Sequence, residues 1–235
     1  MAKEYKCDAI VIYSADFREY DKLLTLYAPT FGKKKVVLRG CKKPTAKLRY
    51  ASTPLFYGEF VIVEGKGYDI VKTVDSKKTF FNIPKDYEKY LDACNILKIV
   101  DANGEYNNFR LLFMLLLTYL SVIDIENSNL DIATSKFMVE ILKMQGFELN
   151  TTICNACSNS FENKIYFDVD LNCFLCENCR KINSEEVDKN IVNLINTLQI
   201  HKFVELVSMS FEENVLKSTK KMLKEIINRQ FFLNL

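Results

Sequence analysis

Residues 7–40 read CDAIVIYSADFREYDKLLTLYAPTFGKKKVVLRG and contain three short apolar runs: Cys7–Tyr13, Leu23–Tyr27 and Val36–Leu38. Turn-forming residues separate these runs, most clearly Pro29 and Gly32. Short runs rich in Val, Ile, Leu and Tyr between Gly and Pro are typical of β-strands. The sequence therefore predicts that the chain opens with β-structure.

Two further runs, Phe56–Val63 and Tyr68–Val74, extend this pattern, with the turn signal Glu64-Gly65-Lys66-Gly67 between them. Five short strands in about 80 residues, without a helical period, indicate a small closed barrel or a sandwich. We expect residues 1–80 to form the first domain.

The apolar period changes from two to about 3.6 residues after Pro84. Asp131 is a candidate helix cap and Gly146 a candidate helix stop. The segment 108–123 is apolar nearly all round, which predicts a buried helix. Helices are predicted at 87–98, Asn108–Ile123, Leu130–Met144, Glu185–Leu198 and Glu212–Phe231.

The helical segments on either side of the cysteine-rich stretch are expected to pack together. We therefore predict an α+β protein in which a helical domain, formed by residues 81–149 and 181–235, contains an inserted module at 150–180. Lys136 and Lys143 on the third helix are interpreted as part of a solvated face; a contact with an acidic peptide tail is the alternative.

The inserted module contains five of the eight cysteines, in the segments Cys154-Asn-Ala-Cys157 and Cys173-Phe-Leu-Cys176-Glu-Asn-Cys179. Two C-x-x-C pairs separated by 15–20 residues are typical of zinc sites, because each turn directs two sulfurs to one ion. Four thiolates leave no coordination position for water, so the predicted zinc is structural.

The second pair is either Cys173 with Cys176 or Cys176 with Cys179. The residues inside the latter pair are polar and suit an exposed turn, whereas Phe174 and Leu175 suit an inward-packing strand. The preferred ligands are Cys154, Cys157, Cys176 and Cys179. The single His, His201, is interpreted as an ordinary surface or core imidazole.

The charge is distributed unevenly, although the formal net charge is only +2. Residues 1–50 hold twelve Lys and Arg against five Asp and Glu. Tyr50, Phe56 and Tyr57 lie close to the most basic stretch. Cations with nearby aromatic rings predict a nucleic-acid-binding surface, and a solvated loop is the alternative. The eight cations of this basic stretch, residues 33–49, are Lys33, Lys34, Lys35, Arg39, Lys42, Lys43, Lys47 and Arg49.

Several function classes lack their signatures in this sequence. There is no G-x-x-x-x-G-K-[ST], H-E-x-x-H or G-x-S-x-G, which argues against a P-loop nucleotidase, a zinc protease of that type and a serine hydrolase. The longest apolar run, Leu111–Leu120, is too short for a membrane helix. We expect a non-enzymatic, cytoplasmic protein without a secretory signal.

The order of these motifs resembles the RecO family of bacterial recombination mediators. The resemblance rests on Ala9–Ile12, Arg18–Leu23, Thr25–Tyr27, Phe31–Lys33 and Val37–Gly40, followed by the basic loop. The leucine-rich helix, the Phe137 to Phe147 helix end and the paired C-x-x-C motifs agree with it. The likeness covers essentially the whole chain.

The resemblance implies an oligonucleotide-binding (OB) barrel followed by a helical domain with a zinc module. It also implies DNA repair and recombination without catalysis: binding of single- and double-stranded DNA, and annealing of complementary strands. The implied partners are RecR, the tail of single-stranded-DNA-binding protein (SSB) and, indirectly, RecA. The basic residues at 33–49 match the family's DNA-contacting positions, and the implied location is the nucleoid.

Two other functions compete with this one. An OB barrel and a zinc ribbon would also suit an RNA-binding or transcription-associated protein. An enzyme with an unrecognised site is the third candidate.

Overall fold

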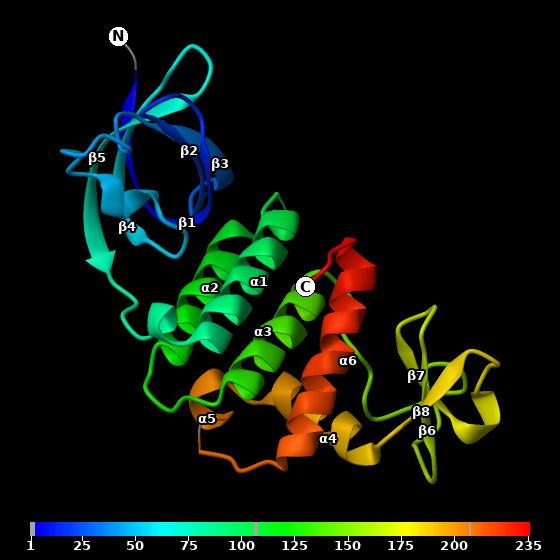
Figure 1. The fold of residues 1–235 in the computed structure, drawn as a ribbon. Helices are drawn as coiled ribbons and strands as arrows, with labels where there is room; N and C mark the ends of the chain where they lie inside the picture. Colours follow the sequence, from blue (N-terminus) through cyan, green and yellow to red (C-terminus); the bar gives the residue numbers. More distant parts are fainter. Residues whose placement is uncertain (1–2, 106–107, 207) are drawn as a thin grey trace. The chain divides into compact units, whose positions relative to one another are not determined.

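The computed structural model describes residues 3–105, 108–206 and 208–235, and Figure 1 traces the order of their helices and strands. The chain divides into two compact units, Met1–Glu126 and Asn127–Leu235. The first unit contains the barrel strands and helices α1 and α2. The second contains helices α3 to α6 and a small three-stranded sheet. No described helix combines the length and apolarity that crossing a membrane requires.

The N-terminal strands form a closed barrel in the order β1-β2-β3-β5-β4. This is the five-stranded arrangement of an OB barrel, so the barrel prediction is confirmed and the sandwich alternative is wrong. Each of the five strands contains all or most of the residues of the apolar run that predicted it. Their bounds are β1 (Glu4–Asp16), β2 (Lys22–Ala28), β3 (Gly32–Leu38), β4 (Tyr57–Val63) and β5 (Asp69–Lys78).

The seam between β3 and β5 is the shortest pairing in the barrel. These strands run parallel and pair only at Val36–Asp69 and Val37–Ile70, whereas the other neighbours pair antiparallel over longer stretches. Alternate residues of β1 to β4 point inward, as a closed barrel requires, and β5, whose pairing with β4 is shifted in register, contributes Val71 and Val74. The buried interior includes Ala9, Val11, Leu24, Leu26, Val36, Leu38, Phe60, Ile62, Val71 and Val74.

Helix α1 (Tyr87–Asn103) is capped by Asp86, whose carboxylate accepts hydrogen bonds from the backbone N–H groups of Glu88 and Lys89. Helix α2 (Phe109–Ile123) follows it. The prediction that this helix is buried all round is wrong, because Leu111 and Met114 are 60% and 52% exposed.

Gly32 begins β3 at a point where the barrel approaches α1 and α2 closely. Its φ is +70°, and a Cβ there would lie 2.5 Å from Phe109 Cδ1 and 2.6 Å from the Gly104 carbonyl oxygen. Both the backbone conformation and the available space therefore require glycine.

Gly32→Ala is expected to lower the free energy of unfolding by about 2 kcal/mol or more, because strain and overpacking act at one position. Urea denaturation would measure the change. Gly67→Ala is the matched control, since no atom lies within 4 Å of a Cβ built there and its φ is not positive. Equal stability of the two variants would contradict the close approach at Gly32.

The second unit is built around α3 (Leu130–Met144), which packs against α4 (Lys189–Ile200) and α6 (Glu213–Phe231). Figure 1 shows α3 and α6 side by side. α3, which precedes the cysteine-rich stretch, thus packs against two helices that follow it, whereas α1 and α2 belong to the first unit. A short helix, α5 (Phe203–Leu206), lies between α4 and α6 in the sequence and was not predicted.

Two helix starts differ from the predictions. Asn129, rather than Asp131, caps α3, because its side chain accepts the N–H of Ile132. The helix predicted at Glu185–Leu198 begins only at Lys189, after Asp188 caps it. Gly146, with φ +81°, lies just after the end of α3, as predicted.

Lys136 is not part of a solvated helix face. It is 3% exposed, and its ammonium contacts the Glu140 carboxylate and donates to the Leu198 carbonyl at 2.7 Å. The interpretation of Lys136 as a solvated surface residue is therefore wrong, and the ammonium is not free to contact an acidic peptide. Lys143 is half-exposed beside Glu148.

The cysteine-rich module forms a small sheet in the order β7-β6-β8. The expected inward-packing strand at Phe174 and Leu175 is present as β7 (Cys173–Cys176), which pairs with β6 (Ile165–Asp168). The other edge of β6 pairs with β8 (Ser184–Val187). Glu185 and Glu186, which were predicted to lie in the first turn of a helix, belong to this strand pairing.

Candidate metal centre and nucleic-acid interface

Four cysteines from two separate segments gather in the module. The sulfur atoms of Cys154, Cys157, Cys176 and Cys179 all lie within 4.8 Å of one another. The first two come from one turn, and the others come from the end of β7 and the short 3₁₀ helix η3 (Glu177–Cys179). The preferred ligand set of the sequence prediction is thus brought together at one point.

Backbone hydrogen bonds shape the first cysteine turn. The N–H of Ser158 donates to the Cys154 carbonyl at 2.9 Å, and the N–H of Cys154 donates to the Asn159 carbonyl at 2.8 Å. The N–H of Asn155 donates to the Phe174 carbonyl at 3.0 Å and so fastens this turn to β7. These bonds position two thiols of the turn next to the thiols of the second segment.

The sulfur geometry fits a tetrahedral zinc ion. Cys157 Sγ and Cys176 Sγ are 3.8 Å apart. A zinc–sulfur bond of about 2.3 Å gives a tetrahedron edge of about 3.8 Å, far longer than the roughly 2.05 Å of a disulfide. The four residues are free thiols. Soft sulfur donors in this arrangement suit zinc.

The electrostatics of the cluster also favour a cation. Burial raises the pKa of Cys154, but backbone N–H groups of Cys176, Cys157 and Ala156 outweigh it and lower this pKa to about 6. Hydrogen bonds to the neighbouring Cys176 and Cys157 sulfurs raise the pKa of Cys179 to about 12. Thiolates crowded together repel one another, and a divalent cation would neutralise them.

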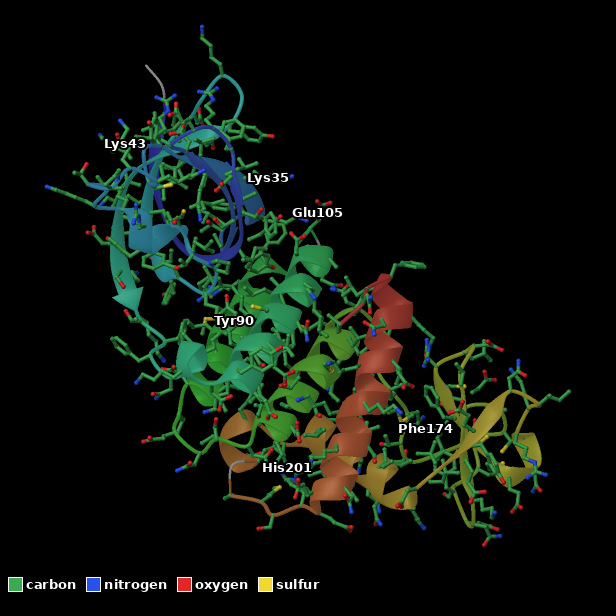
Figure 2. The ribbon with its side chains drawn as sticks, in the orientation of Figure 1. Lys35, Lys43, Tyr90, Glu105, Phe174 and His201 are labelled. Atoms are coloured by element: carbon green, nitrogen blue, oxygen red, sulfur yellow. The ribbon has the colours of Figure 1, made fainter. Side chains whose placement is uncertain are left out.

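The fifth cysteine and the single histidine lie outside this group. Cys173 is buried on β7 opposite Asp168, where burial raises the pKa of its thiol. His201 caps the end of α4, and its Nδ1 lies 3.2 Å from Glu205 Oε2. Figure 2 labels His201 in the helical part of the second unit. It is therefore a paired surface imidazole, as expected.

The apolar cluster next to the four cysteines is small. Cys154, Tyr166, Cys173 and Leu175 form it, and Phe161 packs against them. The Arg180 guanidinium donates to the Tyr166 hydroxyl at 2.9 Å and lies over its ring. This cluster around the cysteines is too small to hold the two cysteine segments together by itself, and a bound metal could contribute much more.

Three of the eight cations in the basic segment are neutralised by carboxylates from other parts of the first unit. Lys33 Nζ lies 3.2 Å from Asp101 Oδ1, 3.7 Å from Glu105 Oε1 and 2.9 Å from the Asp101 carbonyl oxygen, at the end of α1. Figure 2 labels Glu105 there. Lys33 therefore joins the barrel to α1.

The other two neutralised cations lie within the barrel itself. Lys34 Nζ lies 3.3 Å from Asp69 Oδ2 and donates to the Tyr5 hydroxyl, and these hydrogen bonds raise the pKa of Lys34. Lys42 Nζ lies 2.7 Å from Asp16 Oδ2. The side-chain hydrogen bond from Lys42 lowers the pKa of Asp16.

The remaining five cations are exposed, and in the described part of the chain none has a carboxylate within 4.0 Å. Arg49 instead donates to the carbonyls of Lys42 and Lys43, and the Lys43 ammonium lies 5.5 Å from the Tyr20 ring centroid. Figure 2 labels two of the five on the barrel. We call Lys35, Arg39, Lys43, Lys47 and Arg49 the unpaired cations.

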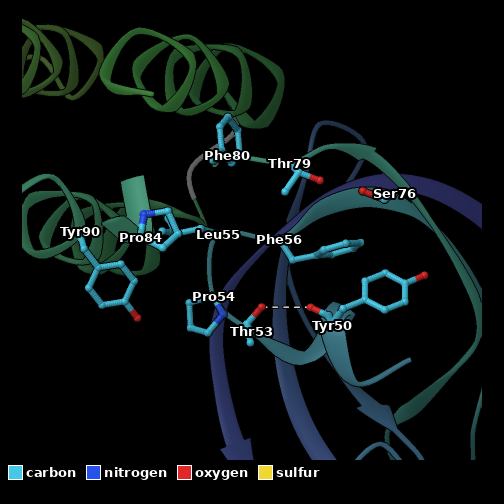
Figure 3. Close-up of a pocket in the computed structure, with 10 residues that line it drawn as sticks. All are labelled: Tyr50, Thr53, Pro54, Leu55, Phe56, Ser76, Thr79, Phe80, Pro84 and Tyr90. Carbon is cyan, nitrogen blue, oxygen red and sulfur yellow. Dashed lines mark hydrogen bonds between the residues drawn. The ribbon is translucent and has the colours of Figure 1, made fainter. Parts of the chain in front are cut away.

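The aromatic residues predicted to accompany these cations are largely packed. Tyr50 and Phe56 line an apolar pocket of about 580 Å³, shown in Figure 3, and their rings meet edge-on at 5.4 Å. The Tyr50 hydroxyl donates to the Val74 carbonyl, although the side chain remains 48% exposed. Tyr57 packs against Phe113.

Four residues that the sequence prediction missed lie at the barrel end beside Arg39: Phe17, Arg18, Lys66 and Tyr68. The sequence did contain a signal for them, because each of the two turns pairs an aromatic residue with a cation. Phe17 is next to Arg18, and Tyr68 follows Lys66 by two residues.

Comparison with known proteins agrees with the resemblance. Residues 1–80 match the family model for the recombination protein O N terminal, and residues 84–235 match that for the recombination protein O C terminal. The chain is 29% identical over 231 residues to the DNA repair protein RecO of Desulforamulus reducens, covering 96% of this chain and 89% of that protein. It is 27% identical to the DNA repair protein RecO of Mycoplasma capricolum, covering 90% and 86% of the two chains.

Proposed function

Because the chain belongs to the RecO family, we propose that it is a DNA repair protein that binds DNA and anneals complementary single strands. In this proposal it acts with RecR to help load RecA onto DNA coated with SSB, whose tail it contacts. It works at the nucleoid as a binding protein rather than as an enzyme.

The observation that carries this proposal is the set of five unpaired cations on the barrel. Two DNA strands repel each other through their phosphates, and cations that neutralise phosphates lower this repulsion. Phosphate contacts carry no base information, so strands of any sequence could be paired in this way. The proposed surface includes all eight predicted basic positions, but carboxylates neutralise Lys33, Lys34 and Lys42, so most phosphate contacts fall to the five unpaired cations.

The proposal also assigns a structural zinc ion to Cys154, Cys157, Cys176 and Cys179. The ion would hold the two cysteine segments together, and the four thiolates would leave no position for a reacting water. The division into an OB domain at 1–80, helical parts at 81–149 and 181–235, and a zinc module at 150–180 is part of the same proposal.

The purified protein is expected to accelerate annealing of complementary DNA oligonucleotides that are coated with SSB, without added nucleotide triphosphate. A fluorescence-quenching assay with dyes on the two strands would measure the rate. The control protein is the variant in which all five unpaired cations are alanine. If the annealing rate with the unmodified protein equals the rate without protein, the proposal is refuted.

The same assay separates the competing functions. Preferential binding and annealing of RNA strands would favour the RNA-binding alternative, since the five cations alone do not distinguish DNA from RNA. Metal-dependent cleavage of either nucleic acid would favour an enzyme.

A further inference from the structure

The turns β1–β2 and β4–β5 enclose a pocket of about 280 Å³ at one end of the barrel. Of the predicted site residues, only Arg39 lines it. Phe17, Arg18, Lys66 and Tyr68 line it as well.

Two exposed aromatic rings meet at this pocket. The centroids of the Phe17 and Tyr68 rings are 5.6 Å apart, with their planes at 88°, and the side chains are 36% and 43% exposed. The Arg18 guanidinium lies 5.1 Å from the Phe17 ring centroid. Exposed rings of this kind offer a stacking surface to an unpaired nucleobase.

The charge around the rings is complementary to phosphate. Arg18, Arg39 and Lys66 have no carboxylate within 4.0 Å in the ranges that the structure describes. Three uncompensated cations around two aromatic rings match a nucleotide, which has an aromatic base and an anionic backbone.

Hydrogen bonds hold the turns of this pocket in place. The Asp21 carboxylate accepts the N–H of Gly40 at 2.8 Å, which ties the β1–β2 turn to the residue after Arg39. In the β4–β5 turn, the Asp69 carboxylate accepts the N–H of Gly65 at 3.3 Å. A Cβ at Gly65 would lie 2.1 Å from the Tyr68 carbonyl oxygen, so the turn is tightly closed. Such turns need little reorganisation to bind a ligand.

On the basis of the proposed DNA-binding function, we propose that this pocket binds one nucleotide of a single DNA strand. The base stacks on the Tyr68 ring and meets the perpendicular Phe17 ring at its edge, and Arg18, Arg39 and Lys66 contact the neighbouring phosphates. Duplex DNA does not bind in this way, because both faces of each internal base are covered by its neighbours. The pocket therefore gives the barrel a preference for single strands.

The chain contains no Trp, which allows a direct test. Tyr68→Trp places the only indole of the protein in the pocket. Its fluorescence is expected to be quenched by a single-stranded DNA oligonucleotide and not by a blunt duplex of the same length. Tyr13→Trp is the matched control, because Tyr13 is 59% exposed on β1 and does not line the pocket.

Affinity measurements complete the test. Tyr68→Leu is expected to weaken single-strand binding on the order of tenfold, within the range for loss of one base–aromatic stack. Its salt dependence and duplex affinity should stay unchanged, whereas Lys66→Ala should flatten the log–log salt slope by about 0.7. Tyr68→Phe should retain binding, and Tyr13→Leu should bind like the unmodified protein.

Two outcomes would contradict the pocket, and the measurements distinguish between them. If the unmodified protein binds single strands but Tyr68→Leu binds equally well and Tyr68→Trp is not quenched, the nucleotide pocket is refuted while the proposed function stands. If the unmodified protein binds no DNA, the proposed function fails and the pocket with it. Thermal melting of each variant identifies any loss of folding.

Discussion

Chelation of the purified protein is expected to remove one zinc ion per chain and to loosen residues 150–180. Structural zinc contributes on the order of 10 kcal/mol to the folding of small zinc modules, and the small apolar cluster next to the cysteines cannot replace that contribution. The helical core should keep a cooperative thermal transition, because α3, α4 and α6 pack on one another through their own apolar faces. Elemental analysis and hydrogen exchange would measure the two effects.

Single substitutions test the choice of ligands. Cys176→Ser should release the metal, since its sulfur is one of the four that lie within 4.8 Å of one another. Cys173→Ser should retain it, because this buried thiol on β7 lies outside that group. Protein prepared under reducing conditions that contains no metal would overturn the zinc prediction. Metal loss on Cys173→Ser alone would show that the other pair provides the ligands.

Replacing all five unpaired cations with alanine is expected to abolish most of the salt dependence of single-strand binding. Each phosphate contact contributes about −0.7 to the log–log slope, so five contacts give a slope of roughly −3.5. Such a slope weakens binding roughly 100-fold between 50 and 200 mM salt. Fluorescence anisotropy titrations at several salt concentrations would measure it, and annealing should decline in parallel.

A neighbouring pair of lysines provides the sharpest control. Lys43→Ala should flatten the slope by about 0.7, because the Lys43 ammonium has no carboxylate partner in the described ranges. Lys42→Ala should change it less, since Lys42 already lies 2.7 Å from Asp16. An unchanged slope in the five-residue variant would identify the basic segment as a solvated loop. The last helix would then be the next surface to test, although Lys217 and Lys220 are paired with Glu213 and Asp131.

The parts of the fold that sequence could predict are those with a local cause. The helix Leu130–Met144 was predicted to the residue, because its period and its Gly146 stop lie within one segment. The start of α4 was misplaced because Glu185 and Glu186 favour helix, yet they pair with β6. That pairing depends on residues of β6 about 20 positions away in the sequence. The periodicity of the local sequence contains no information on such a distant partner.

The candidate site shows the same limit. The C-x-x-C spacing carries the metal prediction by itself, since both turns are local. The neutralisation of Lys33, Lys34 and Lys42 could not be predicted in this way, because the groups that they contact are 68, 35 and 26 residues away in the sequence. The number of cations that the sequence shows at 33–49 is therefore larger than the number free to contact a ligand.

The short seam of the barrel has a consequence for aggregation. Since β3 meets β5 only at Val36 and Val37, the backbone of residues 33–35 has no strand partner on that side in the described structure. An open strand edge is a template for pairing with another polypeptide, and lysines on such an edge oppose that pairing. During synthesis the edge stays open until β5 has been made. The run Lys33-Lys34-Lys35 places three lysines on this edge, and their charge is expected to oppose edge-to-edge association of newly made chains.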